Sequence, residues 1–155
     1  MKTNKKKNMI SKASRYALMF IAGLFGVMAA TQAQSDKIEG IWFNDVKDAK
    51  IQIYKAKDGK FYGKIIWLKE PLKNGKPKLD DKNRKENLKT QPIVGLVILK
   101  YFEKDGDIYE DGTIYDPENG KTYDCKITYK GKTLSIRGYV GISLLGRTTV
   151  WERAG

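Results

Sequence analysis

From Gln34 onward, apolar and polar residues alternate in short segments, which is typical of β-strands. In residues 50–55, Ile51 and Ile53 share one face, whereas Gln52 and Tyr54 share the other. No window of about a dozen residues has the apolar spacing of an amphipathic helix. The pattern predicts eight strands, over residues 40–44, 50–55, 61–68, 93–102, 108–115, 122–129, 133–140 and 147–153.

Short turns join most of these strands. Asp58-Gly59 and Lys130-Gly131-Lys132 are typical hairpin turns, because glycine adopts a positive φ at little steric cost. A meander of eight strands favours a closed antiparallel barrel, because closure removes exposed sheet edges. We therefore predict an all-β fold, an antiparallel meander of about eight strands closed into a small barrel. A two-sheet sandwich is the alternative.

A long polar segment, residues 69–92, interrupts the strand pattern. Pro71, Pro77 and Pro92 exclude a central strand, because proline cannot donate to a strand ladder. Residues 83–89 have the composition of one or two helical turns. The stretch from Lys69 to Lys89 carries eight basic and four acidic residues and no aromatic residue. We expect a long solvated loop that holds a short helix.

The first 33 residues have the composition of a secretory signal peptide. They carry six basic residues and no acidic one, and an apolar run over residues 16–30 precedes Thr31 and Ala33. A basic segment, an apolar segment and a small-x-small site define such a signal. The sequence therefore predicts a cleavable signal peptide over residues 1–33 and a single domain over residues 34–155.

An uncleaved membrane anchor is the alternative for this segment, but a spanning helix needs about 20 apolar residues. The run here is shorter and contains Gly23 and Gly26. We expect an exported bacterial protein, periplasmic or extracellular, with no transmembrane span after cleavage.

The net charge of +12 suggests nucleic acid as a partner, but its distribution argues against this class. After residue 33 there are 24 basic and 18 acidic residues, a net charge of +6, of which +4 lies in residues 69–89. Useful binding to nucleic acid usually adds aromatic platforms to a basic patch. We expect no nucleic-acid partner, and a solvated basic loop able to contact an anionic envelope component.

The chain has no histidine and one cysteine, so the commonest metal ligand and general base is absent from it. We expect no metal site, no cofactor and no assigned catalytic residue. Cys125 shares an apolar strand face with Tyr123 and Ile127, where a thiol behaves as a small hydrophobic group.

Two groups of polar residues form a candidate surface site. They are Asp80, Asp81 and Asn83 in the long loop, and Asp116, Glu118 and Asn119 in a turn. Basic neighbours oppose a dication at the first group, and turn chemistry explains the second. A carboxylate-dependent hydrolase built on these acidic residues is the third functional hypothesis.

Arg137 shares the polar face of a predicted strand with Ser135 and Tyr139. If this face lines the barrel interior, Arg137 and Tyr139 could bind an anionic group. If the face is outside, Arg137 is a surface residue, and this second interpretation is favoured.

Several runs of sequence together resemble one family. They are Phe-Tyr-Gly-Lys-Ile-Ile-Trp-Leu-Lys from Phe61, Gly-Thr-Ile-Tyr-Asp-Pro-Glu-Asn-Gly-Lys-Thr-Tyr from Gly112, Arg-Gly-Tyr-Val-Gly from Arg137, and Trp-Glu-Arg from Trp151. In this order they resemble the domain-of-unknown-function 2147 family of exported bacterial proteins, over nearly all of residues 38–153. The resemblance implies no established reaction.

A weaker resemblance concerns the fold. Gly40-Ile41-Trp42 near the start and a late arginine are similar to the pattern of lipocalins and related calycin barrels. In those proteins the first-strand tryptophan packs under a late arginine and closes one end of the barrel. The resemblance implies that Trp42 pairs with Arg153 or Arg147. Trp151 lies two residues before Arg153 and belongs to the same predicted closure.

The leading hypothesis is a barrel that binds a small apolar or amphipathic, lipid-like ligand without catalysis. Its candidate lining residues are Trp42, Trp67, Tyr123, Arg137 and Tyr139. The alternative is an envelope interaction or structural module whose barrel is filled by side chains, as small eight-stranded barrels often are. The interior volume of the barrel distinguishes the two.

Overall fold

The computed structural model describes residues 34–155, and the predicted signal peptide lies outside the described residues. Ser35–Gly155 form one compact unit. Among residues 34–155, no helix has the length and apolar character needed to cross a bilayer.

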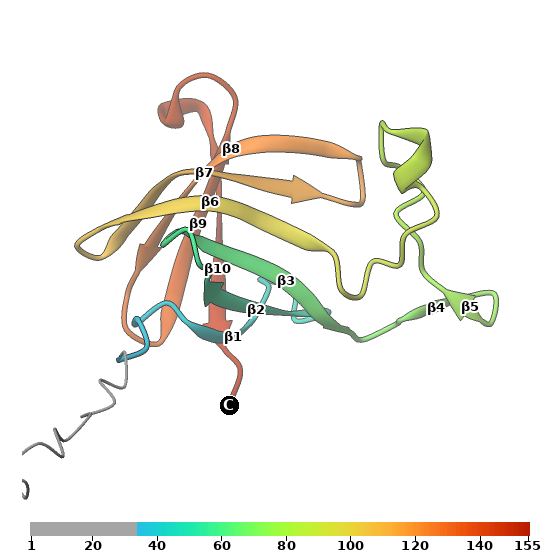
Figure 1. The fold of residues 1–155 in the computed structure, drawn as a ribbon, viewed down its shortest axis with the longest axis horizontal. Coiled ribbons are helices and arrows are strands. Elements are labelled where there is room, and N and C mark those ends of the chain that lie inside the picture. Colours follow the sequence, from blue (N-terminus) through green and yellow to red (C-terminus); the bar gives the residue numbers. More distant parts are fainter. Residues whose placement is uncertain (1–33) are drawn as a thin grey trace, which may run out of the picture. The chain divides into compact units, whose positions relative to one another are not determined.

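Eight antiparallel strands close into a barrel (Figure 1). Their order around the barrel is β1-β10-β9-β8-β7-β6-β3-β2, so the first and last strands are neighbours. The predicted antiparallel barrel is confirmed, and the sandwich alternative is wrong. The barrel strands are β1 (Gly40–Phe43), β2 (Ala49–Lys55), β3 (Phe61–Leu68), β6 (Val97–Asp105), β7 (Ile108–Asp116), β8 (Lys121–Tyr129), β9 (Thr133–Tyr139) and β10 (Arg147–Arg153).

The long polar segment leaves the barrel after β3 and returns before β6; we call residues 69–96 the arm (Figure 1). The arm contains a short hairpin whose two strands, β4 (Leu72–Lys73) and β5 (Lys76–Pro77), have two residues each. It also contains the 3-10 helix η2 (Glu86–Leu88). The short helix agrees with the prediction. β6 begins at Val97 rather than at residue 93, because Ile93 donates its N–H to the Lys78 carbonyl within the arm.

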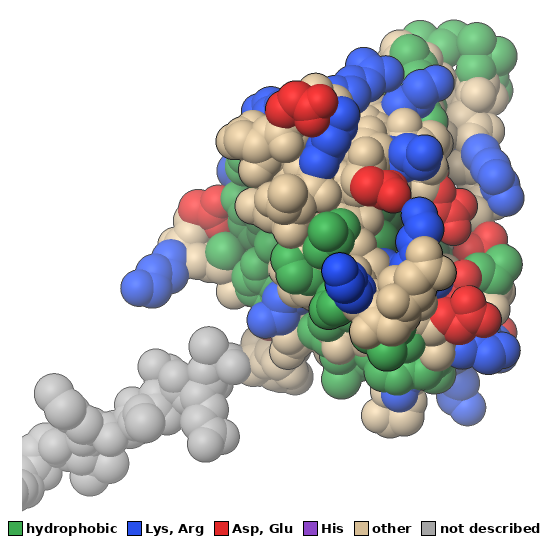
Figure 2. All heavy atoms as spheres, turned by 90° about the vertical axis from the view of Figure 1, so that its right-hand side faces the viewer, with side chains coloured by type: hydrophobic (Ala, Val, Ile, Leu, Met, Phe, Trp, Pro, Cys, Tyr) green, Lys and Arg blue, Asp and Glu red, His purple; other side chains and the backbone are tan. Residues whose placement is uncertain are grey.

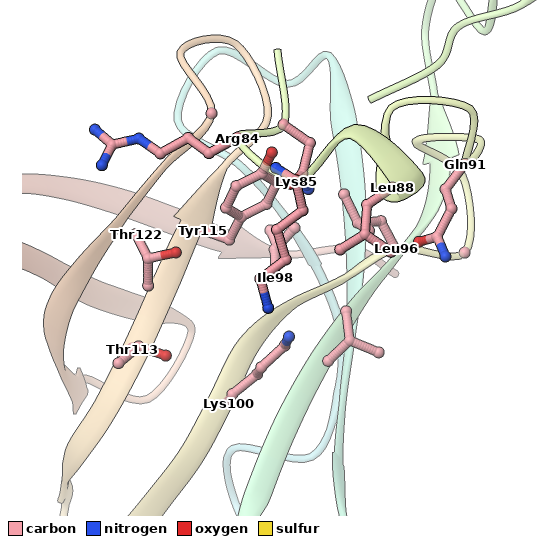
Figure 3. A pocket seen from close by; sticks show the side chains of 14 residues that line it. Arg84, Lys85, Leu88, Gln91, Leu96, Ile98, Lys100, Thr113, Tyr115 and Thr122 are labelled. Atoms are coloured by element: carbon pink, nitrogen blue, oxygen red, sulfur yellow. Dashed lines mark hydrogen bonds between the residues drawn. The ribbon is translucent and has the colours of Figure 1, made fainter. Parts of the chain in front are cut away.

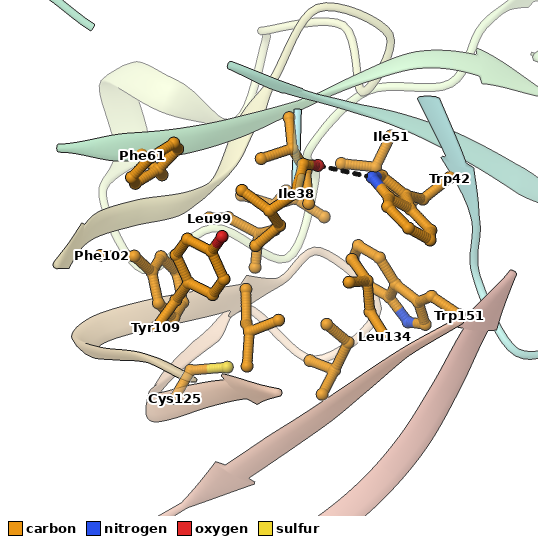
Figure 4. Packing of buried hydrophobic residues seen from close by; sticks show 14 of the residues in the cluster. Ile38, Trp42, Ile51, Phe61, Leu99, Phe102, Tyr109, Cys125, Leu134 and Trp151 are labelled. Atoms are coloured by element: carbon orange, nitrogen blue, oxygen red, sulfur yellow. Dashed lines mark hydrogen bonds between the residues drawn. The ribbon is translucent and has the colours of Figure 1, made fainter. Parts of the chain in front are cut away.

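The barrel interior is filled by side chains (Figure 4). The members of the buried cluster are at most 7% exposed, and Trp42 and Tyr109 have no exposed surface. A cavity that admits water would leave accessible surface on the side chains around it, so these side chains pack against each other. The largest inward-facing members are Trp42, Phe61, Leu99, Phe102, Tyr109, Leu134 and Trp151. The packing matches a barrel whose interior is filled by side chains, and it does not match a barrel with an internal ligand cavity.

One barrel end is closed by the segment before β1. Trp42 lies opposite Arg153 in the β1–β10 ladder, and the Arg153 guanidinium carbon lies 4.1 Å from the centroid of the Trp42 ring. Arg153 also donates to the carbonyls of Glu39 (3.1 Å) and Lys37 (2.6 Å). The indole N–H of Trp42 donates to the Ile38 carbonyl at 2.8 Å. Arg153, rather than Arg147, therefore forms the cation–π contact and holds residues 37–39 over the end of the core.

A β-bulge changes the predicted face of Trp67. The register between β2 and β3 shifts between Lys50 and Ile51, so Ile65 pairs with Ile51 while Trp67 pairs with Lys50. Ile65 is buried, whereas Trp67 is 38% exposed and its ring lies edge-on to Phe43, 6.3 Å between centroids. Strict alternation along residues 61–68 would place Trp67 on the inner face with Phe61, Gly63 and Ile65, as its choice as a lining residue assumed; this is wrong, because the extra residue of a bulge reverses the alternation beyond it.

Asp36 fastens the segment before β1 to the barrel and makes this end sensitive to acid. Burial alone would raise the pKa of its carboxyl, but hydrogen bonds from Lys104, Tyr109 and the Ile38 N–H outweigh burial and lower it. A lowered pKa means that the stabilisation is complete above the ordinary carboxyl range and is lost as the pH falls through the folded-state pKa.

We expect Asp36→Asn to lower the free energy of unfolding by about 1–2 kcal/mol at neutral pH, since charge-assisted hydrogen bonds are lost. Thermal unfolding measured from pH 7 downward should show this difference shrinking below about pH 4. Asp107→Asn is the control, because the Asp107–Lys37 pair is solvent-exposed and contributes little. An equal loss in both variants, or a difference that does not change with pH, would contradict this role of Asp36.

Candidate functional site

The arm is held against the barrel wall by a buried carboxylate. Asp80 has no exposed surface, and its two carboxylate oxygens accept hydrogen bonds from the Tyr115 hydroxyl (2.7 Å) and the Asn83 amide (2.6 Å). Tyr115 lies on β7, so this pair joins the arm to the barrel. Burial, and then the hydrogen bond to Asp80, raise the pKa of Tyr115, so its hydroxyl stays a proton donor at neutral pH.

The turn between β7 and β8 packs directly on the same part of the arm. Gly120 has φ +68°, and a Cβ atom placed on it would lie 1.9 Å from the Lys82 carbonyl oxygen. Only glycine allows the two backbones to approach this closely. Asp80 with Asn83 and the 116–120 turn, two separate motifs in the sequence, therefore meet as one joint in the structure.

Beside this joint, a cleft lies between the arm and the outer wall of the barrel (Figure 3). Its volume is about 570 Å³, within the range of small-molecule sites. β6, β7 and β8 supply Ile98, Lys100, Thr113, Tyr115 and Thr122. The arm supplies Asn83, Arg84, Lys85, Leu88, Gln91, Gly95 and Leu96.

The wall of the cleft is the outer face of the sheet. Lys100 pairs with Thr113 across β6 and β7, and the next pair, Leu99 with Ile114, belongs to the core side. Because strand residues alternate between faces, Lys100 and Thr113 point away from the core. The cleft is thus separate from the barrel interior.

The charge of the cleft is positive. Arg84, Lys85 and Lys100 line it, and no acidic residue does. Among the salt bridges of residues 34–155, none involves these three cations. In Figure 3 the side chains of Lys85 and Lys100 both point into the cleft, with their amino groups toward one another. Lysine side chains that lie close together create a positive potential, which attracts an anionic group.

The cleft also has an apolar part. Leu88 and Leu96 come from the arm, and Val97 and Ile98 from the start of β6 (Figure 3). The hydroxyls of Thr113 and Thr122 lie on the opposite wall. The site therefore combines cations, hydroxyl donors and aliphatic surface, which suits a molecule with an anionic head and an apolar portion.

A second hollow, of about 410 Å³, lies at the β2–β3 turn and is lined by Asp58, Lys60, Glu103 and Lys104 among others. Lys60 and Glu103 already form an ion pair there, at 2.6 Å. Three lysines and two acidic residues line this hollow, and two of the lysines are ion-paired, so it offers less to an anionic ligand than the cleft does.

The structure separates the residues that the sequence suggested as ligand lining. Trp42 is buried beneath Arg153, and Trp67 lies outside against Phe43 and Lys50. Tyr123 lies near the start of β8, where its hydroxyl accepts a hydrogen bond from the Asn119 amide at 3.1 Å. None of the three lines the cleft.

Arg137 lies on the outer face, as the favoured interpretation had it, since its neighbours Leu134 and Ile136 are buried on the inner face. It donates to the carbonyls of Ser143 (2.6 Å) and Leu144 (2.9 Å) and to the Thr148 hydroxyl (2.7 Å). Tyr139, two residues later, shares this face and packs at the base of the same connection, close to Gly146.

Two carboxylates of the polar surface site, those of Asp116 and Asp81, are engaged locally. Asp116 accepts hydrogen bonds from the Glu118 N–H (2.9 Å) and the Asn119 amide (2.7 Å), and Asp81 is ion-paired with Lys73 at 3.3 Å. Within residues 34–155, no group of three acidic or cysteine side chains has the geometry of a metal site. Cys125 is a buried free thiol.

A family model described as "Uncharacterized protein conserved in bacteria (DUF2147)" matches residues 40–153. The chain belongs to the DUF2147 family. This DUF2147 chain is also similar to a solved structure, a Helicobacter pylori protein described as belonging to the lipocalin family, at 24% identity and a TM-score of 0.66. The match covers 76% of this chain and 82% of the other, and it shows a shared lipocalin-like fold. No curated protein matches the chain.

The residues that form the cleft of this DUF2147 protein were not singled out from the sequence. Arg84 and Lys85 appeared there only as basic neighbours in the polar loop, and Lys100 as part of a strand. The excess positive charge of the arm was the available signal. The packing of the arm on the outer wall of the barrel depends on the Asp80–Tyr115 hydrogen bond, which joins residues 35 positions apart in the sequence.

Proposed function

We propose that this DUF2147 protein binds a small anionic amphipathic molecule, such as a fatty acid, in the cleft between the arm and the barrel. Lys85 and Lys100 bind the anionic head, with Arg84 at the edge of the cleft, and Leu88, Leu96 and Ile98 contact the apolar portion. The observation that carries the proposal is a partly aliphatic cleft into which Lys85 and Lys100 point and which no acidic residue lines.

The position of this site differs from the barrel interior that a lipocalin-like fold would suggest. Inward-facing residues of the strands are buried against one another, which supports an external site over an internal one. The ligand class is still the amphipathic one expected from the sequence.

We further propose that the protein acts outside the cytoplasm, in the periplasm or beyond. The basic and apolar composition of residues 1–33 supports this location. Fatty acids and related amphiphiles are chemically available in a bacterial envelope, so the location and the ligand class are consistent.

Titration calorimetry with decanoate tests the proposal, using decanol as an uncharged probe with the same chain length. We expect decanoate to bind with a saturable isotherm and decanol to bind at least about ten-fold more weakly, because an ion pair with the lysines is missing. In the variant Lys85→Gln with Lys100→Gln, the decanoate dissociation constant should rise about ten-fold or more.

The matched control is Lys57→Gln with Lys130→Gln, which removes the same charge from two exposed residues that do not line the cleft. Its affinity should stay within about two-fold of the parent. Equal weakening in both double variants would mean that only the net charge matters, and unchanged affinity in the cleft variant would place the ligand elsewhere. Either result overturns the proposal.

A further inference from the structure

The connection between β9 and β10, residues 140–146, presents large aliphatic side chains to solvent. We call it the apolar loop. Its four aliphatic side chains are between 60% and 81% exposed, namely Val140, Ile142, Leu144 and Leu145. Figure 1 shows the loop projecting beyond the strand ends, and Figure 2 shows hydrophobic side chains gathered at the top of the molecule. Soluble proteins rarely expose such a group of residues without a partner.

The loop has a defined conformation. Arg137 donates to two of its carbonyls, those of Ser143 and Leu144, and residues Ser143–Leu145 form the 3-10 helix η3. Gly146 packs tightly at the base, where an added Cβ would lie 2.6 Å from the Gly138 carbonyl. Because these contacts fix the backbone, the aliphatic side chains are held outward rather than collapsing onto the barrel.

Further exposed apolar residues lie at the same end of the barrel. The apolar loop, the β1–β2 connection and the arm all join strands at this end, as the antiparallel order of the strands requires. Val46 in the β1–β2 connection is 67% exposed, and Leu72 in the arm is 54% exposed. The opposite end is the one closed by residues 37–39 and Arg153.

The charge around the loop is basic. Arg137 lies at the base of the loop, where its guanidinium donates to two loop carbonyls. Arg147 follows the loop directly and is exposed. Outside the arm, the acidic residues at this end are Asp124, opposite Tyr139 in the β8–β9 ladder, Asp45 and Asp48 between β1 and β2, and Asp116 and Glu118 at the β7–β8 turn. The arm at the same end adds a net charge of +4 over residues 69–89.

We propose that the apolar loop inserts into the surface of an anionic lipid bilayer and so docks this end of the barrel on a membrane. A convex group of aliphatic side chains suits the boundary between head groups and acyl chains, which needs no preformed pocket. The neighbouring cations match the negative charge of the lipid head groups. This proposal uses a different surface from the cleft and does not depend on ligand binding there.

Site-specific fluorescence tests the proposal in the full chain. Leu144→Cys is labelled with an environment-sensitive thiol dye and mixed with vesicles of phosphatidylglycerol and phosphatidylethanolamine. Burial raises the pKa of the Cys125 thiol to about 12, so the dye attaches to the introduced cysteine. We expect the emission to rise about three-fold or more and to be quenched by lipids that carry a quencher on the upper acyl chain.

Val150→Cys is the matched control, because Val150 is also exposed (52%) but lies on β10 outside the loop. A dye at this position should show no quenching by acyl-chain quenchers. In Leu144→Cys chains that also carry Arg147→Gln, the lipid concentration at half-saturation should rise about three-fold or more, as expected when one basic contact is lost.

Three results would overturn the proposal. The first is a dye at residue 144 that stays in water in the presence of the vesicles. The second is equal quenching at residues 144 and 150, which would mean that another part of the chain binds the lipid. The third is an emission change that appears without lipid as the protein concentration rises, which would assign the loop to contact between copies of the chain.

Discussion

Replacing Gly120 with alanine is expected to separate the arm from the barrel wall and abolish the cleft. The added Cβ would lie 1.9 Å from the Lys82 carbonyl oxygen, and the backbone at this position has φ +68°. Both backbones must move, so the Asp80–Tyr115 hydrogen bond cannot keep its length of 2.7 Å. We expect a loss of more than about 2 kcal/mol in the free energy of unfolding, together with loss of decanoate binding.

Gly131→Ala is the matched control for Gly120→Ala. Gly131 has a similar φ of +77°, but no atom lies within 4 Å of an added Cβ. It should therefore show only the conformational cost of a left-handed residue, about 1–2 kcal/mol, with decanoate affinity unchanged. Chemical unfolding and titration calorimetry of both variants make the comparison. If the two glycines behaved alike in both measurements, the joint between the arm and the turn would have no special role.

The second large effect is expected for Trp42→Ala, at about 3–5 kcal/mol in the free energy of unfolding. Trp42 has no exposed surface, and its loss removes the hydrogen bond to the Ile38 carbonyl and the contact with Arg153. The barrel end would lose the side chain on which residues 37–39 rest. Urea unfolding followed by far-ultraviolet circular dichroism measures the change.

Trp67→Ala is the comparison. The sequence predicts both tryptophans to lie in strands and to line the barrel, but in the structure Trp42 faces inward and Trp67 faces outward. Trp67 is 38% exposed and contacts Phe43 and Lys50 on the outer wall, so we expect a loss below about 1.5 kcal/mol. Neither residue lines the cleft, so decanoate affinity should be unchanged in Trp67→Ala. A large loss of affinity there would return the ligand to the barrel interior or its rim.

The strands were predictable from the sequence because each depends on local alternation. Residues 61–68 and 147–153 match β3 and β10 at both ends. The bulge opposite Lys50 and Ile51 was not predictable, because a single extra residue leaves the composition of the strand unchanged while it turns Trp67 outward. The start of β6 was placed too early for a related reason. Residues 93–96 are as apolar as a strand, but Ile93 bonds to Lys78 within the arm, and Gly95 and Leu96 bond to Ile65 of β3 outside the regular ladder.

The candidate site was less predictable than the fold. The sequence indicated Asp80, Asn83 and Asp116 as part of a polar surface site. In the structure their hydrogen bonds hold the arm and the 116–120 turn in place. The cleft beside this joint takes its cations from the arm and from β6. These cations lie apart in the sequence, so the sequence alone does not indicate that they meet. Long-range packing of a loop on a sheet depends on tertiary contacts that alternation and composition do not encode.

The pairing of the first and last strands, which closes the barrel, has a consequence for biosynthesis. β1 pairs with β10, and Trp42 is covered by Arg153, the last residue of the final strand. While the chain is being synthesised, the opening strand has no partner on that side until β10 has left the ribosome. The native ring of strands can thus form only after β10 has left the ribosome, and a truncation before β10 would leave two unpaired edges and an uncovered indole.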